Sequence, residues 1–406
     1  MSLYEILKQR GYIAQMTHEE EIKDLLNNQK IPFYIGFDPT AASLHVGHFL
    51  QIMAAGIMQK YGHVPIILIG GGTTMVGDPS GRTDMRKMLT QDEINANGER
   101  FKNQLKNFIS FENNAAIMVN NADWLLDINY IDFLREYGSF FSVNRMLTAE
   151  AYKNRMEKGL TFLEFNYMIM QAYDFLQLNI RHGVVLQMGG NDQWSNIIAG
   201  VDLIRRVRNT SAYGLTFTLL TTGSGEKMGK TAKGALWLDK NKTTPYEFYQ
   251  YFRNTEDTNV SAYLKLLTNT PLEEIKEIEN LKGKEINQAK TLLAYEITKL
   301  VHGEEEAGKA KAAALSIFEA KESSENMPSY FIDKTKLEEG ISILELLQEA
   351  KLISSRSEGR RLIRQKGIKI NGVVSEDEEF KVKSLTDLII QKGKKTYCKI
   401  IPRDNQ

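Results

Sequence analysis

The sequence contains a single cysteine, Cys398, among its 406 residues. One cysteine cannot form a disulfide within the chain, which fits a reducing compartment such as the cytoplasm. One cysteine and six scattered histidines also suggest no zinc site. No apolar run approaches the roughly 18 residues of a membrane-spanning helix, and the N-terminus has no secretory pattern. We therefore expect a cytoplasmic globular protein without a membrane segment.

The charged residues have no net excess of either sign, but they are unevenly distributed along the chain. From Ile341 to the end, 14 Lys and Arg face 9 Asp and Glu, so this part carries +5 and the remainder −5. A basic tail on a slightly acidic body favours a polyanionic partner for the tail. The charge distribution alone is explained equally well by a solvated charged surface that binds no partner. The length of 406 residues exceeds what one core supports, so we expect two or three domains.

The most informative stretch runs from Phe33 to Leu50. Apart from Gly36, its first five residues are aromatic or β-branched, which predicts a short buried strand. Asp38-Pro39-Thr40 ends that strand, and apolar residues at helical spacing predict a helix that begins between His45 and Gly47. A strand, a short loop and a helix N-terminus place free backbone N–H groups against a phosphate. Gly47 would let a flat group approach the backbone.

Two histidines, His45 and His48, would lie on one face of the first helical turn. Alone, such a pair is usually an ordinary surface or core feature. However, His45-Val46-Gly47-His48 resembles the first signature of the class I aminoacyl-tRNA synthetases, with Val in place of Ile. The run upstream, from Tyr34 to Thr40, is similar to the tyrosyl family in particular. The resemblance implies that ATP is bound by Gly36, Asp38, His45, Gly47 and His48, and that Thr40, His45 and His48 are catalytic.

A second apolar run, from Val64 to Ile69, predicts a buried parallel strand that ends in glycines. Strand, helix and strand then form a βαβ unit, in which ligands bind at the carboxyl ends of the strands. Asp78 lies at this edge; it is either a turn former before a proline or, as the resemblance implies, a ligand of the substrate ammonium. Arg82, where the family usually has Lys, and Arg86 are candidate pyrophosphate contacts, with a solvated helix face as the alternative.

A polar stripe marks the predicted helix over residues 161–178, which Thr161 opens as part of a capping box. Tyr167, Gln171 and Asp174 fall at positions i, i+4 and i+7 of an otherwise apolar helix. Such a stripe is costly unless something hydrogen-bonds it, and a bound amino acid would do so; neighbouring chain or water is the alternative. The resemblance implies that Tyr167 and Gln171 bind the substrate amino group.

The same resemblance pairs Asp174 with Tyr34 on a substrate phenol. A buried carboxylate and a tyrosine hydroxyl offer an acceptor and a donor to a phenol, and phenylalanine would leave both unpaired. Asn120–Trp124 is also similar to a segment of the tyrosyl family, but the residues alone suggest no role for it.

Two glycine-containing segments complete the expected catalytic site. The strand predicted over residues 184–188 ends before Asp192 and Gln193, which the resemblance assigns to the ATP ribose and to the substrate carboxylate. Residues 223–231 resemble the second class I signature, with Lys227 and Lys230 kept and Gly and Thr where two serines are common. Two lysines in a glycine-rich loop can stabilise the leaving pyrophosphate, and Lys230 is also an expected ATP contact. An ordinary flexible basic loop is the alternative.

The last part of the chain is expected to bind RNA. Residues 355–365 predict a strongly basic helix, and Asn371-Gly372 between two short apolar runs predicts a hairpin. Together they are similar to the small RNA-binding domain first named from a ribosomal small-subunit protein. A packing role for the helix is the alternative. The expected tRNA contacts are Arg356, Arg360, Arg361 and Arg364.

These patterns predict an α/β fold. We expect a Rossmann-like parallel-sheet nucleotide-binding catalytic domain (1–244), an α-helical domain on the anticodon side (245–327), a linker (328–340) and a small α+β RNA-binding domain (341–406). Residues 13–26 are expected to form a scaffold helix.

The resemblance covers nearly the whole chain and implies a tyrosine–tRNA ligase. It implies ATP as a substrate with Mg²⁺, tRNA(Tyr) as partner and a homodimer, and we see no dedicated metal-ligand cluster. A tryptophanyl enzyme shares the fold and both signatures, but Tyr34 with Asp174 argues against it. A non-catalytic RNA-binding protein would have no need of His45, His48 and both lysines.

Overall fold

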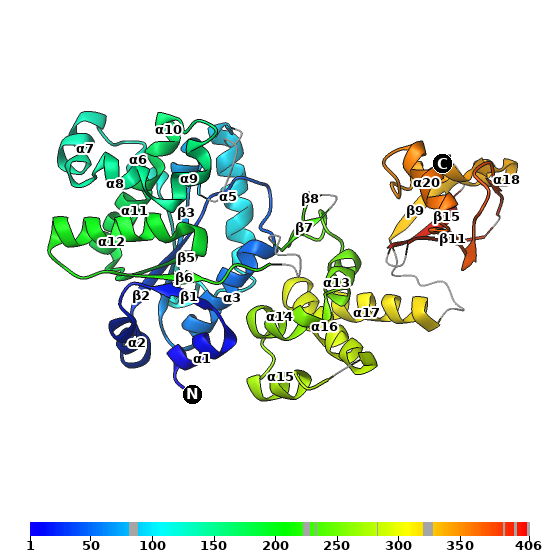
Figure 1. Cartoon of the computed structure of the whole chain (residues 1–406), viewed down its shortest axis with the longest axis horizontal. Helices are drawn as coiled ribbons and strands as arrows, with labels where there is room; N and C mark the ends of the chain where they lie inside the picture. Colours follow the sequence, from blue (N-terminus) through cyan, green and yellow to red (C-terminus); the bar gives the residue numbers. More distant parts are fainter. Residues whose placement is uncertain are drawn as a thin grey trace. The chain divides into compact units, whose positions relative to one another are not determined.

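The structure is a computed structural model, and it describes residues 1–80, 88–221, 228–231, 234–281, 283–319, 328–384, 386–393 and 396–403. The chain divides into two compact units. Unit 1 comprises Met1–Asp239 and Ser261–Ile275, and unit 2 comprises Lys240–Val260 and Lys276–Gln406. Each unit is described by itself below (Figure 1).

Unit 1 is built on a six-stranded sheet in the order β1-β6-β5-β2-β3-β4, in which only β1 is antiparallel to its neighbour. Its central strands carry almost only apolar side chains and are buried, as expected for a parallel sheet covered on both faces. The strands are β1 Ile13–Met16, β2 Pro32–Phe37, β3 Val64–Ile69, β4 Ile117–Asn120, β5 Leu186–Gly190 and β6 Tyr213–Phe217.

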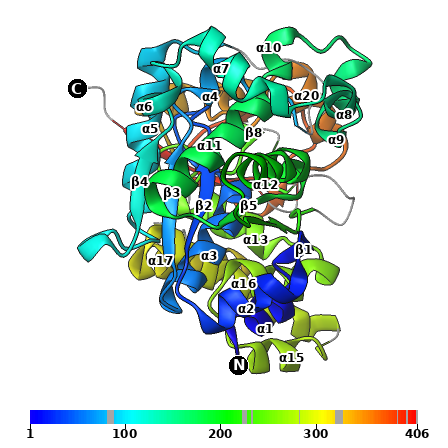
Figure 2. The same ribbon diagram turned by 90° about the vertical axis from the view of Figure 1, so that its left-hand side faces the viewer.

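Helices cover both faces of this sheet. Figures 1 and 2 show α11 and α12 on one face and α3 and α5 on the other. The helices before the end of the sheet are α1 Leu3–Arg10, α2 Glu19–Asn28, α3 Val46–Lys60, α4 Thr73–Val76, α5 Gln91–Leu105, α6 Ala122–Leu125, α7 Tyr130–Glu136, α8 Val143–Leu147, α9 Glu150–Met156, α10 Phe162–Phe165, α11 Tyr167–His182 and α12 Trp194–Arg208. Three short 3₁₀ segments, Glu112–Asn114, Gly138–Phe140 and Asn191–Gln193, lie between them.

The strands predicted at 33–37 and 64–69 and the helix predicted to begin near His45 are confirmed. The helix predicted over 13–26 is wrong in its first part. Gly11, with φ of 82°, ends α1, and residues 13–16 form β1 because they pair with the edge of β6. Within the predicted range only α2 is helical. A local helical pattern cannot distinguish one long helix from an edge strand that is followed by a shorter helix.

The segment Ser261–Ile275 belongs to unit 1, and hydrogen bonds from Arg10 and Tyr12 join it to the N-terminal part of the chain. Arg10 donates to the carbonyl oxygens of Lys265, Thr268 and Thr270, and Tyr12 donates to Leu266 at 2.6 Å. The helices from this point to residue 319 are α13 Pro245–Arg253, α14 Val260–Leu267, α15 Leu272–Ile278, α16 Ile286–His302 and α17 Glu304–Glu319, with 3₁₀ segments Asp257–Asn259 and Gly283–Glu285.

The C-terminal part of unit 2 contains a five-stranded sheet in the order β12-β11-β14-β15-β9, with a core of aliphatic side chains. The predicted hairpin is confirmed: β11 pairs with β12, and Asn371 and Gly372 both have positive φ. The elements are β9 Ser329–Asp333, α18 Lys334–Glu339, β10 Ile341–Ser342, α19 Ile343–Glu349, α20 Arg356–Arg364, β11 Ile368–Ile370, β12 Val373–Val374, β13 Lys381–Val382, β14 Leu388–Lys392 and β15 Thr396–Arg403.

The linker predicted at 328–340 is wrong. Residues 329–333 are β9, which pairs in parallel with β15, and residues 334–339 form α18. The linker prediction rested on the break signals Pro328 and Gly340, whereas the partner strand that orders residues 329–333 lies about 70 residues further along the chain. The other domain boundaries stay a prediction.

Candidate active site

A pocket of about 510 Å³ opens at the carboxyl ends of β2, β3 and β5 in unit 1. This is where ligands bind in open parallel sheets. Thirteen of the residues selected from the sequence line it: Tyr34, Gly36, Asp38, Thr40, His45, Gly47, His48, Asp78, Tyr167, Gln171, Asp174, Asp192 and Gln193. Arg82, Arg86 and Lys227 lie outside the described residues. Lys230 is described only as part of the backbone of β7 (Lys230–Thr231).

The two histidines form a hydrogen-bonded stack at the start of α3. His45 Nδ1 accepts from the Gly47 N–H at 3.0 Å, and His48 Nδ1 accepts from the His45 N–H at 3.2 Å. Their ring centroids lie 3.9 Å apart at 22°. Because each Nδ1 is an acceptor, a neutral ring carries its proton on Nε2. A side chain at Gly47 would come within 2.8 Å of the His45 ring, so the glycine makes room for this imidazole.

Asp38 connects three elements of the pocket wall. One carboxylate oxygen accepts from Thr73 Oγ1 on α4 and the other from the Tyr167 hydroxyl on α11, both at 2.8 Å. A Cβ at Gly70, after β3, would collide with this carboxylate. Asp38 therefore orients Tyr167, and a contact between Asp38 and ATP stays a prediction.

An amide network surrounds Asp78. Asp78 accepts from the Ser80 N–H at 2.9 Å and from Gln193 Nε2 at 2.7 Å. Asn196 Nδ2 donates to the side-chain oxygens of Gln171 and Gln193, both at 3.1 Å, so it orients both amides. Burial raises the pKa of Asp78. A buried carboxylate held this way can bind an ammonium group. Asn196 was missed from the sequence because nothing in its own helix marks it.

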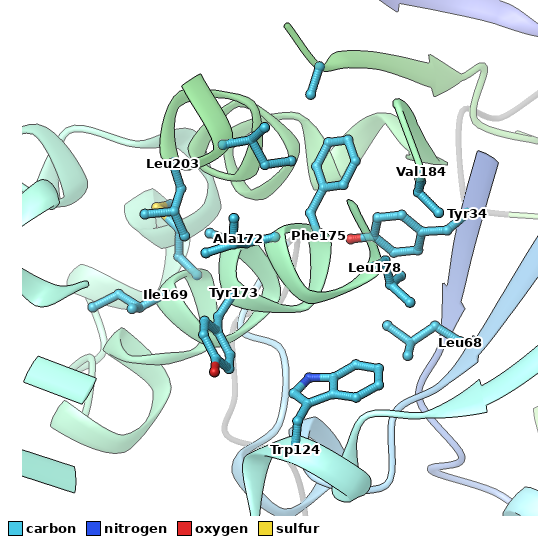
Figure 3. Packing of buried hydrophobic residues seen from close by; sticks show 14 of the residues in the cluster. Tyr34, Leu68, Trp124, Ile169, Ala172, Tyr173, Phe175, Leu178, Val184 and Leu203 are labelled. Atoms are coloured by element: carbon cyan, nitrogen blue, oxygen red, sulfur yellow. The ribbon is translucent and has the colours of Figure 1, made fainter. Parts of the chain in front are cut away.

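The inner end of the pocket contains Tyr34 and Asp174. Figure 3 shows the ring of Tyr34 beside Phe175 of α11, within the buried cluster that also contains Trp124. Asp174 is 1% exposed and accepts from Asn121 Nδ2 at 2.9 Å and Trp124 Nε1 at 2.8 Å. Burial raises its pKa to about 7, although these two hydrogen bonds lower it. The hydroxyl of Tyr34 is buried and has no hydrogen-bond partner among the described residues.

Asn121 and Trp124 contact Asp174, although the sequence alone assigned them no role. Asn121 also donates to Thr73 Oγ1 at 2.9 Å and accepts from the Gly72 N–H at 2.8 Å, so one side chain links Asp174 to the Asp38 cluster. The signal was the similarity of residues 120–124 to the tyrosyl family. Their partner lies about 50 residues away, so local pattern could not reveal the contact.

The expected RNA-binding helix is α20 in unit 2, and its four arginines are exposed. Arg364 pairs with Glu378 at 2.5 Å, and Arg360 lies 3.7 Å from the same carboxylate. Among the described residues, no ion pair involves Arg356 or Arg361. The helix therefore presents two arginines bound to an acidic loop and two without such a pair.

Within the described ranges, no group of three or more His, Cys, Asp or Glu side chains could hold a metal ion. In the same part of the chain, every helix is too short or too polar to cross a lipid bilayer.

Comparison with known proteins decides the family. The model of class I tRNA synthetases of the W and Y type matches residues 26–319, and that of the tyrosine–tRNA ligase SYY-like C-terminal domain matches residues 319–400. The chain belongs to the class I tRNA synthetases. Two curated relatives called tyrosine–tRNA ligase, from Acetivibrio thermocellus and Caldanaerobacter subterraneus, are 60% and 59% identical. The matches cover 98% and 100% of this chain and 99% and 100% of the relatives.

Solved structures agree with this synthetase fold. A C-terminally truncated mitochondrial tyrosyl-tRNA synthetase from Aspergillus nidulans has a TM-score of 0.70 at 31% identity, covering 78% of this chain and 94% of its own. A tryptophanyl-tRNA synthetase from Encephalitozoon cuniculi has a TM-score of 0.58 at 13% identity, covering 76% and 89%, so that likeness concerns the fold alone.

Proposed function

We propose that this class I synthetase is a tyrosine–tRNA ligase. It activates L-tyrosine with ATP to tyrosyl-adenylate and pyrophosphate, and then transfers tyrosine to the 3′ end of tRNA(Tyr). The observation that carries the proposal is the pair of Tyr34 and Asp174 at the inner end of the pocket. A phenol can donate to the carboxylate and accept from the hydroxyl, whereas an indole N–H offers a donor only.

The amino end of tyrosine is held by the polar groups nearer the mouth of the pocket. Asp78 supplies the negative charge for the ammonium, and Tyr167 and Gln171 supply further acceptors on α11. Tyr167 is hydrogen-bonded to Asp38, and Gln171 is hydrogen-bonded to Asn196. Both side chains are therefore oriented before tyrosine binds, which lowers the entropic cost of binding. Gln193 lies beside Asp78, where it can contact the substrate carboxylate.

The first step needs no strong general base, because the attacking tyrosine carboxylate is already anionic. Its oxygen forms a bond to the α-phosphorus of ATP, and the bond to the leaving pyrophosphate breaks. The rate comes from positioning and charge stabilisation. We assign stabilisation to Thr40, His45, His48, Lys227 and Lys230. ATP is further held by Gly36, Asp38, Gly47 and Asp192, and pyrophosphate by Arg82 and Arg86.

Mg²⁺ is proposed to enter with ATP. Mg²⁺ commonly keeps several waters and is bound largely through substrate phosphates, so it requires no all-protein cage. In the second step, a terminal ribose hydroxyl of tRNA attacks the tyrosyl carbonyl and AMP leaves. Arg356, Arg360, Arg361 and Arg364 are proposed to contact tRNA phosphates, and the cytoplasm is the proposed location.

A homodimer is also proposed. Its support is a set of large apolar side chains exposed on α7, α8 and α10, among them Ile131 at 59%, Val143 at 56% and Phe162 at 70% exposure. Single exposed apolar residues are ordinary, but several of them on three short helices of the same unit favour an interface. Sedimentation equilibrium measures the mass directly; a monomer at micromolar concentration contradicts this part.

Amino-acid-dependent exchange of labelled pyrophosphate into ATP tests the function. Tyrosine, phenylalanine and tryptophan are compared in parallel without tRNA. Exchange with tyrosine alone is expected. Exchange with tryptophan would instead favour the sister enzyme, and folded protein that exchanges with none of them would overturn the catalytic assignment.

A further inference from the structure

A backbone bridge joins the segment after the second signature to the start of α3. The Val46 N–H donates to the Leu236 carbonyl at 3.0 Å, and the Leu238 N–H donates to the Leu44 carbonyl at 2.9 Å. His45 and Trp237 are thereby antiparallel β-bridge partners. Leu236 and Leu238 are 3% and 6% exposed, so buried side chains anchor the bridge on both sides.

The same segment is bound to the described end of the second signature. The Leu236 N–H donates to the Gly229 carbonyl at 2.7 Å, and the Met228 N–H donates to the Leu220 carbonyl at 2.8 Å. Strand β7 continues from Gly229 and pairs with β8 (Gly234–Ala235). Gly229 lines the pocket with φ of 87°, a conformation that other residues rarely adopt. The bridge therefore joins the first signature and the described end of the second, residues 228–231, in one hydrogen-bonded frame.

Aromatic rings contact both histidines of the stack, and Trp237 is the ring that contacts His45 from the segment after the second signature. Its ring lies edge-on to His45, with centroids 6.1 Å apart at 62°. On the other side of the stack, Phe37 and Phe101 each lie 5.9 Å from His48. Such tilted ring contacts are favourable and directional. The hydrogen bond from the Gly47 N–H holds Nδ1 of the His45 imidazole, and the Trp237 ring packs against the same imidazole.

We propose that Trp237 is a positioning residue for the activation step, acting through His45. By its bridge and its ring it holds the His45 imidazole at the angle needed to meet the phosphates of ATP, and it ties that angle to the strand that carries Lys230. The inference rests on the proposed function. It adds a residue that contacts neither the phenol nor the ammonium end of the substrate pocket, because Trp237 is absent from the pocket lining.

The test compares Trp237→Leu and Trp237→Phe with the wild type in tyrosine-dependent pyrophosphate exchange. A misplaced catalytic group can cost on the order of 100-fold in rate, so we expect Trp237→Leu to lower kcat about 10- to 100-fold. The KM for tyrosine should stay within about twofold, and Trp237→Phe should recover most of kcat. An unchanged kcat, or a tyrosine KM that rises in step with the loss, overturns the proposal.

A double-mutant cycle with His45→Ala separates positioning from simple structural damage. If Trp237 acts through His45, Trp237→Leu costs little further activity in the His45→Ala background; two losses that multiply contradict the inference. Phe248→Leu is a matched control, because Phe248 makes an edge-on contact of the same kind with His302 in unit 2. It should lower thermal stability without changing the ratio of kcat to tyrosine KM. Failure of the wild type to exchange with tyrosine would instead reject the proposed function, so the two failures are distinguishable.

Discussion

The inner end of the pocket and helix α20 both carry charged groups that we propose to bind a ligand, but these groups are held in opposite ways. Asp174 is 1% exposed and fixed by Asn121 and Trp124, whereas the side chains of Arg360 and Arg364 are 47% and 72% exposed and share Glu378. Electrostatic interactions between buried groups are strong and depend little on salt concentration, whereas those between exposed charges are screened by salt. The difference predicts a site that discriminates by geometry and a surface that binds by charge.

The largest effect is expected from Asp174→Asn. The change replaces a charged acceptor that two buried donors hold, and hydrogen bonds to charged groups contribute about 1.5–3 kcal/mol each. We expect kcat/KM for tyrosine to fall by at least about 100-fold and the preference over phenylalanine to collapse. Pyrophosphate exchange with both amino acids measures this. Wild-type discrimination in the variant would remove Asp174 from the phenol site.

Removal of the C-terminal domain should separate the activity of the pocket from the tRNA binding proposed for α20. The cut belongs after residue 319, because β9 is paired with β15 and a cut at residue 340 would leave β9 without its partner. We expect pyrophosphate exchange to stay within about twofold and tRNA charging to fall by more than about tenfold, because phosphate contacts supply much of the affinity. Equal loss of both activities contradicts the division of labour.

A smaller, pH-dependent effect is expected from Asn121→Ala. The pKa of Asp174 is about 7, and the hydrogen bond from Asn121 lowers it. Tyrosine binding that needs the ionised carboxylate therefore weakens as pH falls through about 7. Without Asn121 the pKa rises further, so the midpoint moves to higher pH. Equilibrium dialysis of tyrosine from pH 5.5 to 8.5 measures the shift, and Asp174→Asn, which cannot titrate, is the control. A midpoint that stays in place refutes this role of Asn121.

The smallest effects are expected on α20. Arg364 must leave Glu378 to contact a phosphate, whereas Arg361 has no such pair among the described residues. We expect Arg361→Ala to weaken tRNA binding more than Arg364→Ala, by a few-fold, and Glu378→Gln to strengthen it. Filter binding between 50 and 200 mM salt checks this; each lost phosphate contact should lower the salt slope by roughly 0.7–0.9. Equal losses in both arginine variants, independent of salt, would contradict electrostatic binding.

Much of the fold was predictable because its signals are local. A strand buried on both faces of a parallel sheet needs a continuous apolar run, and Val64–Ile69 is such a run. The hairpin needs two residues with positive φ, and Asn371 and Gly372 adopt this conformation readily. The failures at 13–16 and 329–333 were both edge strands. An edge strand is stabilised by a partner distant in sequence, and its own residues need no strong pattern.

The sequence by itself determined which chemical groups the protein has: two signature histidines, a polar stripe on a buried helix and a basic C-terminal helix. The tertiary structure decided which groups support them. Asn121 and Trp124 contact Asp174, Asn196 contacts Gln171, and Trp237 contacts His45; each pair joins segments far apart in the chain. The reason is physical: a motif depends on the order of residues, whereas the pKa and orientation of a buried group depend on neighbours that only folding brings within hydrogen-bond distance.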